Sequence, residues 1–440
     1  MKALLLAFLA AAPAALHAAA PAGATFPASP SLDDCLRLAV EHSPSLRIAR
    51  DQIREQEGVD IEIRSADLPS LGFQAGATYT DEERQESFGP DMAPPKEGWN
   101  AGLRVSYNVY AGGSVTANRA GQQERIAAAQ AGFESALATT VMKVRSDFYG
   151  ALLARSRIAV REEAVQLNEQ QLKLARNRFD SGAGSQFEVL RAEVALSNSR
   201  PPLIRAREEH RTAIDQVRQT IGVPFAPGQG PGDIDLKGGW DIPGKPFELS
   251  PLLDLARKAR ADIRRAEALV AASRHALDAA AAGRRPRVDV YGDYGVRSSM
   301  FSSDADELKG YELGAQASWP IWDAGATKGR VQQAETRLSQ AETAREDMMM
   351  SIEQEVRNAH SNWQVSAEIL RTSDDVIRQA QEALRLAQAR FEAGAGTQID
   401  VLSSQLELIQ ARLEKDSAAH NLLVAVAQLR KAVGDSGLEP

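Results

Sequence analysis

The sequence predicts a mixed α and β membrane protein, made of two similar halves, in which very long coiled-coil helices are joined to four short strands. Residues 174–190 and 386–402 are identical at ten of their seventeen positions, which indicates an internal twofold sequence repeat. Two segments of roughly 65 residues have helical patterns and no proline. Four short segments alternate between apolar and polar residues, as strands with one apolar face do.

Residues 1–20 predict a secretory signal peptide. Lys2 precedes an apolar run that ends at Leu16, and the alanines from Ala18 to Ala20 provide a cleavage site of small residues. No later stretch of about 18 apolar residues occurs, so no helix is expected to cross a membrane.

The composition argues against several classes of function. A formal net charge of −8 disfavours nucleic acid as a partner. The six histidines are scattered without the spacing of metal ligands, and no phosphate-binding loop or nucleophile beside a base is present. We therefore expect no metal, no cofactor and no enzymatic activity. The single cysteine, Cys35, allows no internal disulfide and is expected to be a small buried apolar residue.

The repeat divides the mature chain into two halves. The first half, 21–221, is expected to contain a helix, strands at about 70–80 and 99–109, a long helix at about 113–180 and a return helix at about 186–221. The second half, 249–440, is expected to contain a helix, strands at about 287–297 and 310–321, a long helix at about 325–392 and a return helix at about 398–433. Residues 222–248 are rich in glycine and proline and form a connector.

The alternating segments have the length of strands that cross a membrane. In residues 99–109, Trp99 and Leu103 fall on one side and Arg104 on the other. A tilted strand of about 9–11 residues spans a bilayer, and aromatic residues near its ends form a girdle. Four strands cannot close a barrel in lipid, so several chains must share one barrel. Four half-buried strands of a soluble sandwich are the alternative interpretation.

The long helices predict a rod. Each would span about 100 Å at 1.5 Å per residue. In the second, small and apolar residues recur roughly every 3.5 residues, as in a coiled coil. The opening helices, about 32–66 and 250–283, and the return helices are each about half as long. Two short helices stacked end to end can lie beside one long helix, with strands at one end of the rod and glycine turns at the other. Pro201 and Pro202 predict a kink in the first return helix.

The chain resembles the TolC-like outer-membrane efflux proteins. The residues that carry the resemblance are the turns RFDSGAGSQFEVL and RFEAGAGTQIDVL, the segments 107–113 and 319–325 that leave the strands, and the signal peptide. The resemblance implies a homotrimer in the outer-membrane lipid of a Gram-negative cell, in which three chains pool twelve strands into one barrel and the helices form a periplasmic tunnel. The implied function is a passive channel-tunnel of a tripartite efflux or type I secretion system, with a periplasmic adaptor (membrane fusion) protein and an inner-membrane pump as partners.

In that family the turns at the inner end of the tunnel meet the helical hairpin of the adaptor. The matching adaptor-docking positions in this chain are Gly182, Ala183, Ser185, Gly394, Ala395 and Thr397. Small residues suit such docking because they let backbones approach closely. The same glycines must also cap the helices that end there.

The family also has acidic residues after the second turn that narrow the closed pore. Asp400 matches the first of them, Ser403 stands at the second, and Glu188 holds the equivalent place in the first half. A ring of Asp400 carboxylates would attract cations, but Asp400 is also suited to stabilise the first turn of its helix. Phe391 and Gly396 replace the tyrosine and arginine of the family's best-known latch.

A periplasmic structural coiled-coil protein with a small soluble sheet, and without transport, is the second interpretation of the same pattern. The two interpretations differ in whether the apolar face of the strands meets lipid.

Overall fold

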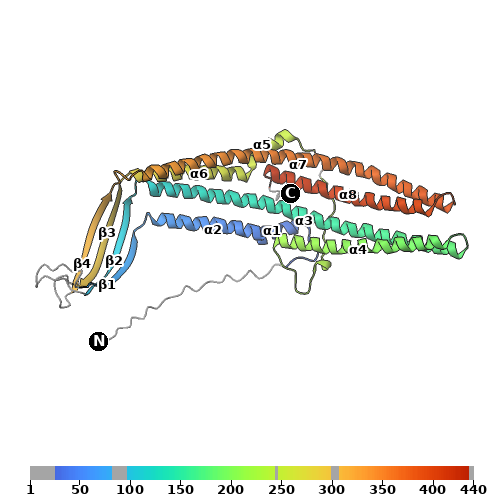
Figure 1. Ribbon diagram of the computed structural model, residues 1–440, viewed down its shortest axis with the longest axis horizontal. Coiled ribbons are helices and arrows are strands. Elements are labelled where there is room, and N and C mark those ends of the chain that lie inside the picture. The colour runs from blue at the N-terminus through green and yellow to red at the C-terminus, as the bar shows by residue number, and fades with distance from the viewer. Residues whose placement is uncertain (1–24, 82–96, 243–245, 299–306, 436–440) are drawn as a thin grey trace, which may run out of the picture.

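The computed structural model is an elongated rod with a sheet at one end and two helix turns at the other (Figure 1). It describes residues 25–81, 97–242, 246–298 and 307–435, so the predicted signal peptide lies outside the described residues. Within these ranges, no helix combines the length and the apolar character needed to cross a membrane.

Two helices of 67 residues run from the sheet to the turns: α3 (Ser114–Asp180) and α7 (Ala326–Glu392). Each begins after a glycine in the left-handed region, Gly113 with φ +89° and Gly325 with φ +90°. This conformation suits glycine because it has no Cβ. Neither helix contains a proline, so no amide donor is missing along its length.

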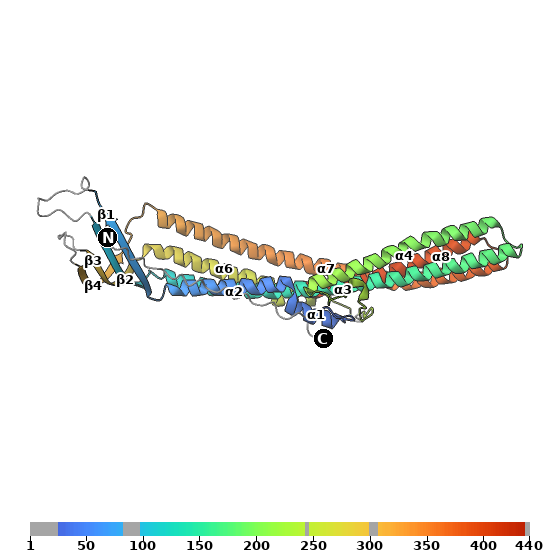
Figure 2. The same cartoon turned by 90° about the horizontal axis from the view of Figure 1, so that it is seen from below.

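Shorter helices flank the long ones. The first half contains α1 (Leu32–His42), α2 (Pro44–Ser65) and α4 (Gln186–Ile221). The second half contains α5 (Leu249–Ala259), α6 (Ala261–Ala281), the short 3-10 helix η3 (Ala282–Arg284) and α8 (Gln398–Val433). Helices α2 and α4 lie end to end along α3, while α6 and α8 both contact α3 and α7 (Figures 1 and 2).

The opening helix of each half is broken, although the sequence analysis predicted continuous helices over about 32–66 and 250–283. In the first half, Pro44 begins α2 and disfavours a helical conformation at Ser43, which has ψ 128°. In the second half the break falls at Arg260, with ψ 120° and no neighbouring proline. The first break has a local cause, whereas the second depends on the contacts of Arg260 described below.

Both breaks lie against the end of a return helix. A Cβ on Gly222 would lie 2.6 Å from the carbonyl oxygen of His42, and a Cβ on Gly434 would lie 3.0 Å from the carbonyl carbon of Ala259. The two glycines also have φ +81° and +82°. Only glycine satisfies both the close approach and the left-handed backbone.

Helix α4 continues through Pro201 and Pro202, where the sequence analysis predicted a kink. Each proline removes one amide donor from the helix. Helix α4 packs extensively against α3, and such packing is the main source of helix stability in proteins. This tertiary support outweighs the local effect of the prolines.

The largest apolar core lies at the middle of the rod. Val144 and Phe148 of α3, Ile214 of α4 and Cys35 of α1 are buried in it. The connector covers this core and includes the 3-10 helix η2 (Pro231–Asp233). Arg155 of α3 holds the connector by donating hydrogen bonds to the carbonyl oxygens at 236 and 238.

The sheet is antiparallel in the order β1 (Ser70–Tyr79), β2 (Glu97–Tyr110), β3 (Arg287–Ser298) and β4 (Glu307–Ser318). Directly paired residues lie on the same face of a sheet. Leu103 pairs with Phe73 on one side and Tyr294 on the other, and Tyr294 pairs with Tyr311. The four apolar stripes therefore share one face. This face is uncovered in the single chain, where Leu313 is 77% exposed.

The opposite face of the sheet is polar. The side-chain amide of Asn108 donates to Asp289 at 2.6 Å. The guanidinium of Arg104 lies 3.6 Å from the carboxylate of Asp293 and 4.9 Å from the ring centre of Tyr291. These pairs link neighbouring strands β2 and β3 on the side away from the apolar stripes.

Strand β4 ends at Ser318, earlier than the predicted end at 321. Pro320 has no amide proton to continue the ladder. The indole N–H of Trp319 instead donates to the carbonyl oxygen of Arg284 at 3.0 Å. This hydrogen bond connects the end of β4 to η3, the short helix that precedes β3.

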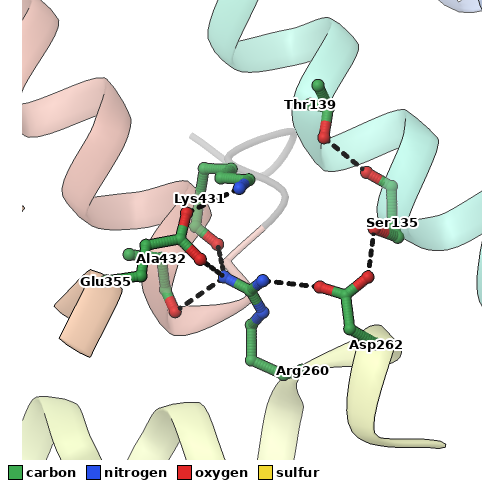
Figure 3. Close-up of polar contacts among 7 residues, drawn as sticks. All are labelled: Ser135, Thr139, Arg260, Asp262, Glu355, Lys431 and Ala432. Atoms are coloured by element: carbon green, nitrogen blue, oxygen red, sulfur yellow. Dashed lines mark hydrogen bonds and ion pairs between the residues drawn. The ribbon is translucent and has the colours of Figure 1, made fainter. Parts of the chain in front are cut away.

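A buried arginine joins three helices at the junction of the second half (Figure 3). Arg260 is 6% exposed, and its Nη1 donates to Glu355 of α7 at 2.9 Å. The same nitrogen donates to the carbonyl oxygens of Lys431 and Ala432 at the end of α8, at 3.2 and 3.1 Å. Lys431 also pairs with Glu355 at 2.6 Å. The guanidinium therefore satisfies carbonyls that the end of α8 leaves without intrahelical donors.

Asp262 extends this cluster to α3. It accepts hydrogen bonds from Arg260 and from Ser135 of α3, both at 2.5 Å. Burial raises the pKa of Asp262, but the hydrogen bond from Ser135 and the charge of Arg260 outweigh it and leave the pKa below the ordinary 3.8. The carboxylate thus stabilises the folded state above the unfolded-state pKa, and this contribution is lost as the pH falls through the lower folded-state pKa.

We predict that Asp262→Asn lowers the melting temperature at neutral pH, because a hydrogen bond to a charged group contributes about 1.5–3 kcal/mol. The difference from the unsubstituted chain should stay nearly constant from about pH 7 to about pH 4. It should shrink only below the ordinary pKa of 3.8, as the pH approaches the lower folded-state pKa. Thermal unfolding followed by circular dichroism measures both effects. Asp254→Asn, at an exposed position of α5, is the control and should change little. A loss of equal size at every pH would contradict a role for the Asp262 charge.

Candidate functional site

The two turns that join the helix pairs lie together at one end of the rod (Figure 1). Gly182 and Gly394 both have φ +75°, and a Cβ on either would point into open space. The amide of Ala183 donates to the carbonyl oxygen of Arg178 at 2.9 Å, and that of Ala395 donates to Arg390 at 2.8 Å. Both turns therefore end their long helix with a glycine in the left-handed conformation and leave small side chains at the surface.

Each return helix begins at a hydroxyl cap. Ser185 accepts a hydrogen bond from the amide of Glu188, and Thr397 accepts one from the amide of Asp400, both at 3.3 Å. Only the second turn forms a reciprocal capping box, in which the backbone amide of Thr397 donates to the carboxylate of Asp400 at 2.9 Å. The hydrogen bonds from the backbone and the hydroxyl of Thr397 lower the pKa of Asp400, so this exposed carboxylate is charged at neutral pH.

Glu188 has a different environment from Asp400. It is half-buried, and its Oε2 has no hydrogen-bond partner among the described residues. Its backbone carbonyl accepts a hydrogen bond from the side chain of Gln398 at 3.3 Å, which connects the first turn to the second. The hydroxyl of Ser403, at the position of the family's second acid, donates to the carbonyl oxygen of Asp400 at 3.1 Å.

A second contact between the turns involves Arg178 and Phe391. The guanidinium of Arg178 lies 4.8 Å from the ring centre of Phe391, which is 8% exposed. Sequence reasoning missed Arg178 and Gln398 as tip residues. The one available signal for Arg178 was its recurrence as Arg390 in the second copy of the turn. All eight predicted site residues lie in this tip, and the roles assigned to them remain proposals.

Apolar side chains surround the turns. Phe179 is 46% exposed, Phe187 is 66% exposed and Ile399 is 53% exposed. Exposed apolar groups that gather in one region are typical of surfaces that meet a partner. Phe179 is the counterpart of the buried Phe391 in the repeat, so the two turns present different surfaces.

The part of the chain that the structure describes holds no group of three or more histidine, cysteine, aspartate or glutamate side chains able to bind a metal ion. The tip presents small residues, apolar rings and carboxylates, which include Asp180 and Glu392 at the ends of the long helices besides Glu188 and Asp400.

The profile of the outer membrane efflux protein family matches residues 35–223 and 252–435. The chain belongs to this family. The two matched segments correspond to the two halves and omit most of the connector. The family resemblance seen in the sequence is thus confirmed, and this outer-membrane efflux protein is not an enzyme.

Two curated relatives cover most of the chain. The efflux protein is 27% identical to Protein CyaE of Bordetella pertussis, over 98% of this chain and 90% of that protein. It is 23% identical to the outer membrane protein TolC of Vibrio cholerae, over 84% of this chain and 83% of the relative.

A solved structure shares the fold. The outer membrane protein VceC of Vibrio cholerae superimposes with a TM-score of 0.75 at 20% identity, over 92% of this chain and 96% of that chain. The long helices and the four-stranded sheet of the efflux protein thus have the arrangement of a known outer-membrane protein.

Proposed function

We propose that the chain is the channel-tunnel of a tripartite efflux or type I secretion system, which passively conducts substrates from an adaptor and an inner-membrane pump to the outside. One observation carries the proposal: a single rod presents an uncovered apolar sheet face at one end and exposed turns of small residues at the other. The helices between them span about 100 Å. A structural coiled-coil protein with a soluble sheet would have no reason to leave that face uncovered.

The proposed assembly is a homotrimer with a shared barrel of twelve strands in outer-membrane lipid. In one chain, β1 and β4 are the edge strands, and open edges are not tolerated in a bilayer. The helical layer also has apolar residues on both outer sides: Met350 and Ile369 of α7 are 66% and 53% exposed, and Ile61 of α2 is 72% exposed. If α2 of one chain packs against α7 of the next chain, the exposed apolar residues of both helices are covered.

The equal lengths of corresponding helices support an origin by internal duplication. Helices α3 and α7 each have 67 residues, and α4 and α8 each have 36. Each half also has two strands, so the two halves contribute equally to the proposed barrel and tunnel.

The barrel is tested by placing a charge on either face of β4. Leu313→Arg should impair insertion and trimer formation, because a cation at the bilayer midplane costs about 2–4 kcal/mol. Gln316→Arg, on the opposite face of the same strand, should be tolerated. Native mass spectrometry of detergent-extracted protein should show a trimer for Gln316→Arg and little trimer for Leu313→Arg. Equal tolerance of the two variants, or a stable monomer in plain buffer, would refute the shared barrel.

The tip is the proposed docking surface for the adaptor, with Gly182, Ala183 and Ser185 in the first turn and Gly394, Ala395 and Thr397 in the second. The left-handed glycines keep the turns compact, and the open space around them admits the tip of a helical hairpin. The exposed rings of Phe179 and Phe187 provide apolar area beside the small residues.

Docking is tested by cross-linking from a single introduced cysteine. Burial raises the pKa of Cys35 to about 12, so the native thiol should not react with maleimides at neutral pH. Ala395→Cys, labelled with a photoreactive maleimide in cells, should cross-link to the hairpin peptide of the adaptor. Ser339→Cys, an exposed position of α7 far from the tip, is the control. Cross-links to the adaptor from both sites, or from neither, would argue against docking at the tip.

Asp400, together with Glu188, is proposed to form the pore aperture. Threefold symmetry would bring three Asp400 carboxylates around one opening, and a ring of carboxylates attracts cations. The capping box uses the same carboxylate, so the charge and the helix cap must be separated experimentally.

Two variants separate the charge from the cap. Asp400→Asn keeps a side-chain oxygen for the amide of Thr397 but removes the charge, so it should lower the cation preference and the block by trivalent cations. Thr397→Ala keeps the charge but removes the hydroxyl cap, so it should lower the melting temperature and leave selectivity near that of the unsubstituted channel. Single-channel recording measures selectivity and block. Unchanged selectivity and block in Asp400→Asn would exclude Asp400 from the aperture.

A further inference from the structure

A cavity in the tip half of the rod lies between α3, α4 and α8, and its wall does not include the proposed docking and aperture residues. Its volume is about 390 Å³, which falls within the range of about 300–1,000 Å³ that is typical of small-molecule sites. Apolar side chains from all three helices form most of its wall: Leu167, Val194, Leu402, Leu406 and Ile409.

A cation without an acidic partner stands at one end of this cavity. Arg161 of α3 is half-buried and also lines an adjacent cavity of about 400 Å³. Across the described ranges Arg161 makes no ion pair. Its acidic neighbours in the sequence have other partners, since Glu162 pairs with Arg207 at 2.8 Å and Glu163 pairs with Arg412. Glu209 and Glu414 line the adjacent cavity, but none of the aspartates and glutamates that the structure describes lines this one. A half-buried guanidinium that forms no ion pair favours an anionic group, which it can bind through two hydrogen bonds.

Further polar groups of the wall have unused hydrogen-bonding capacity. Gln405 of α8 is 3% exposed, and its Nε2 has no hydrogen-bond partner in the described part of the chain. Pro202 also lines the cavity and cannot donate to the carbonyl of Asn198, one turn earlier in α4. Buried polar groups are normally paired, so an unpaired amide in a cavity wall fits a ligand that carries an acceptor.

We propose that this cavity binds a single-chain anionic amphiphile, with its carboxylate or sulfate on Arg161 and its apolar chain along Leu402 and Leu406. Arg161 lies about 50 residues along α3 from the strands, roughly 75 Å at 1.5 Å per residue. A lipid of the bilayer around the sheet does not reach that far, so the occupant is a dissolved amphiphile. The site lies within one chain and does not depend on the assignment of the docking or aperture residues.

The test uses a dansyl-labelled undecanoate as the probe and the full chain in lipid nanodiscs. Titration should give saturable fluorescence, and Arg161→Gln should weaken binding at least roughly tenfold because the charge-assisted hydrogen bonds of the guanidinium are lost. Leu402→Trp, at a half-buried side chain of the cavity wall, should fill the cavity and abolish saturable binding without preventing folding. Arg371→Gln, which removes an exposed charge from α7, is the matched control and should bind as the unsubstituted chain does.

An uncharged amide of the same probe completes the design. It should bind the unsubstituted chain roughly tenfold more weakly than the carboxylate does, and Arg161→Gln should bind the two probes alike. Equal binding of the carboxylate probe by Arg161→Gln and Arg371→Gln would overturn the proposal. Equal binding of the amide and the carboxylate by the unsubstituted chain would also overturn it, because it would show partition into the nanodisc lipid.

Discussion

The two long helices have 67 residues each, and the helices that cover them have at most 36 residues each. The rest of the structure depends on this difference in length. Each long helix needs two short neighbours in succession, and the junctions between them fall at the middle of the rod. Helix ends at a junction leave amides and carbonyls without intrahelical partners. In the first half, Gly222 at the end of α4 packs closely against His42 and Pro44, where α1 ends and α2 begins. In the second half, the buried Arg260 donates hydrogen bonds to the last carbonyls of α8. The main apolar core, with the connector around it, lies at the same level.

This rigid middle separates two surfaces of different character. The sheet exposes an apolar face and two edge strands, while the tip exposes small residues, aromatic rings and the carboxylate of Asp400. Continuous helices connect them, so the spacing between the surfaces depends on backbone hydrogen bonds rather than on flexible joints. The cluster around Arg260 links α3, α6, α7 and α8 at the point where a hinge would otherwise be expected.

A feature could be predicted from the sequence when residues close to it in the chain cause it, and not when its cause lies in distant residues. The strands could be predicted because alternation is a local pattern, and β3, at Arg287–Ser298, lies where residues 287–297 alternate. Pro44 was a usable signal for the first helix break. The break at Arg260 had no such signal, since its partners Glu355 and Ala432 are distant in the sequence. At the tip, the glycine turns were recognisable, whereas the contact of Arg178 with Phe391 depends on how two helix pairs pack.

The pairing of β2 with β3 makes the sheet a late product of folding. Leu103 pairs with Tyr294 in the other half of the chain, while α3 with α4 and α7 with α8 are neighbours in the sequence. Contacts between distant residues form slowly, because a large loop must close first. Until then the strand edges and the apolar face are open to aggregation. The sheet is therefore the part of the chain that must be kept from contact with other chains until both halves have folded.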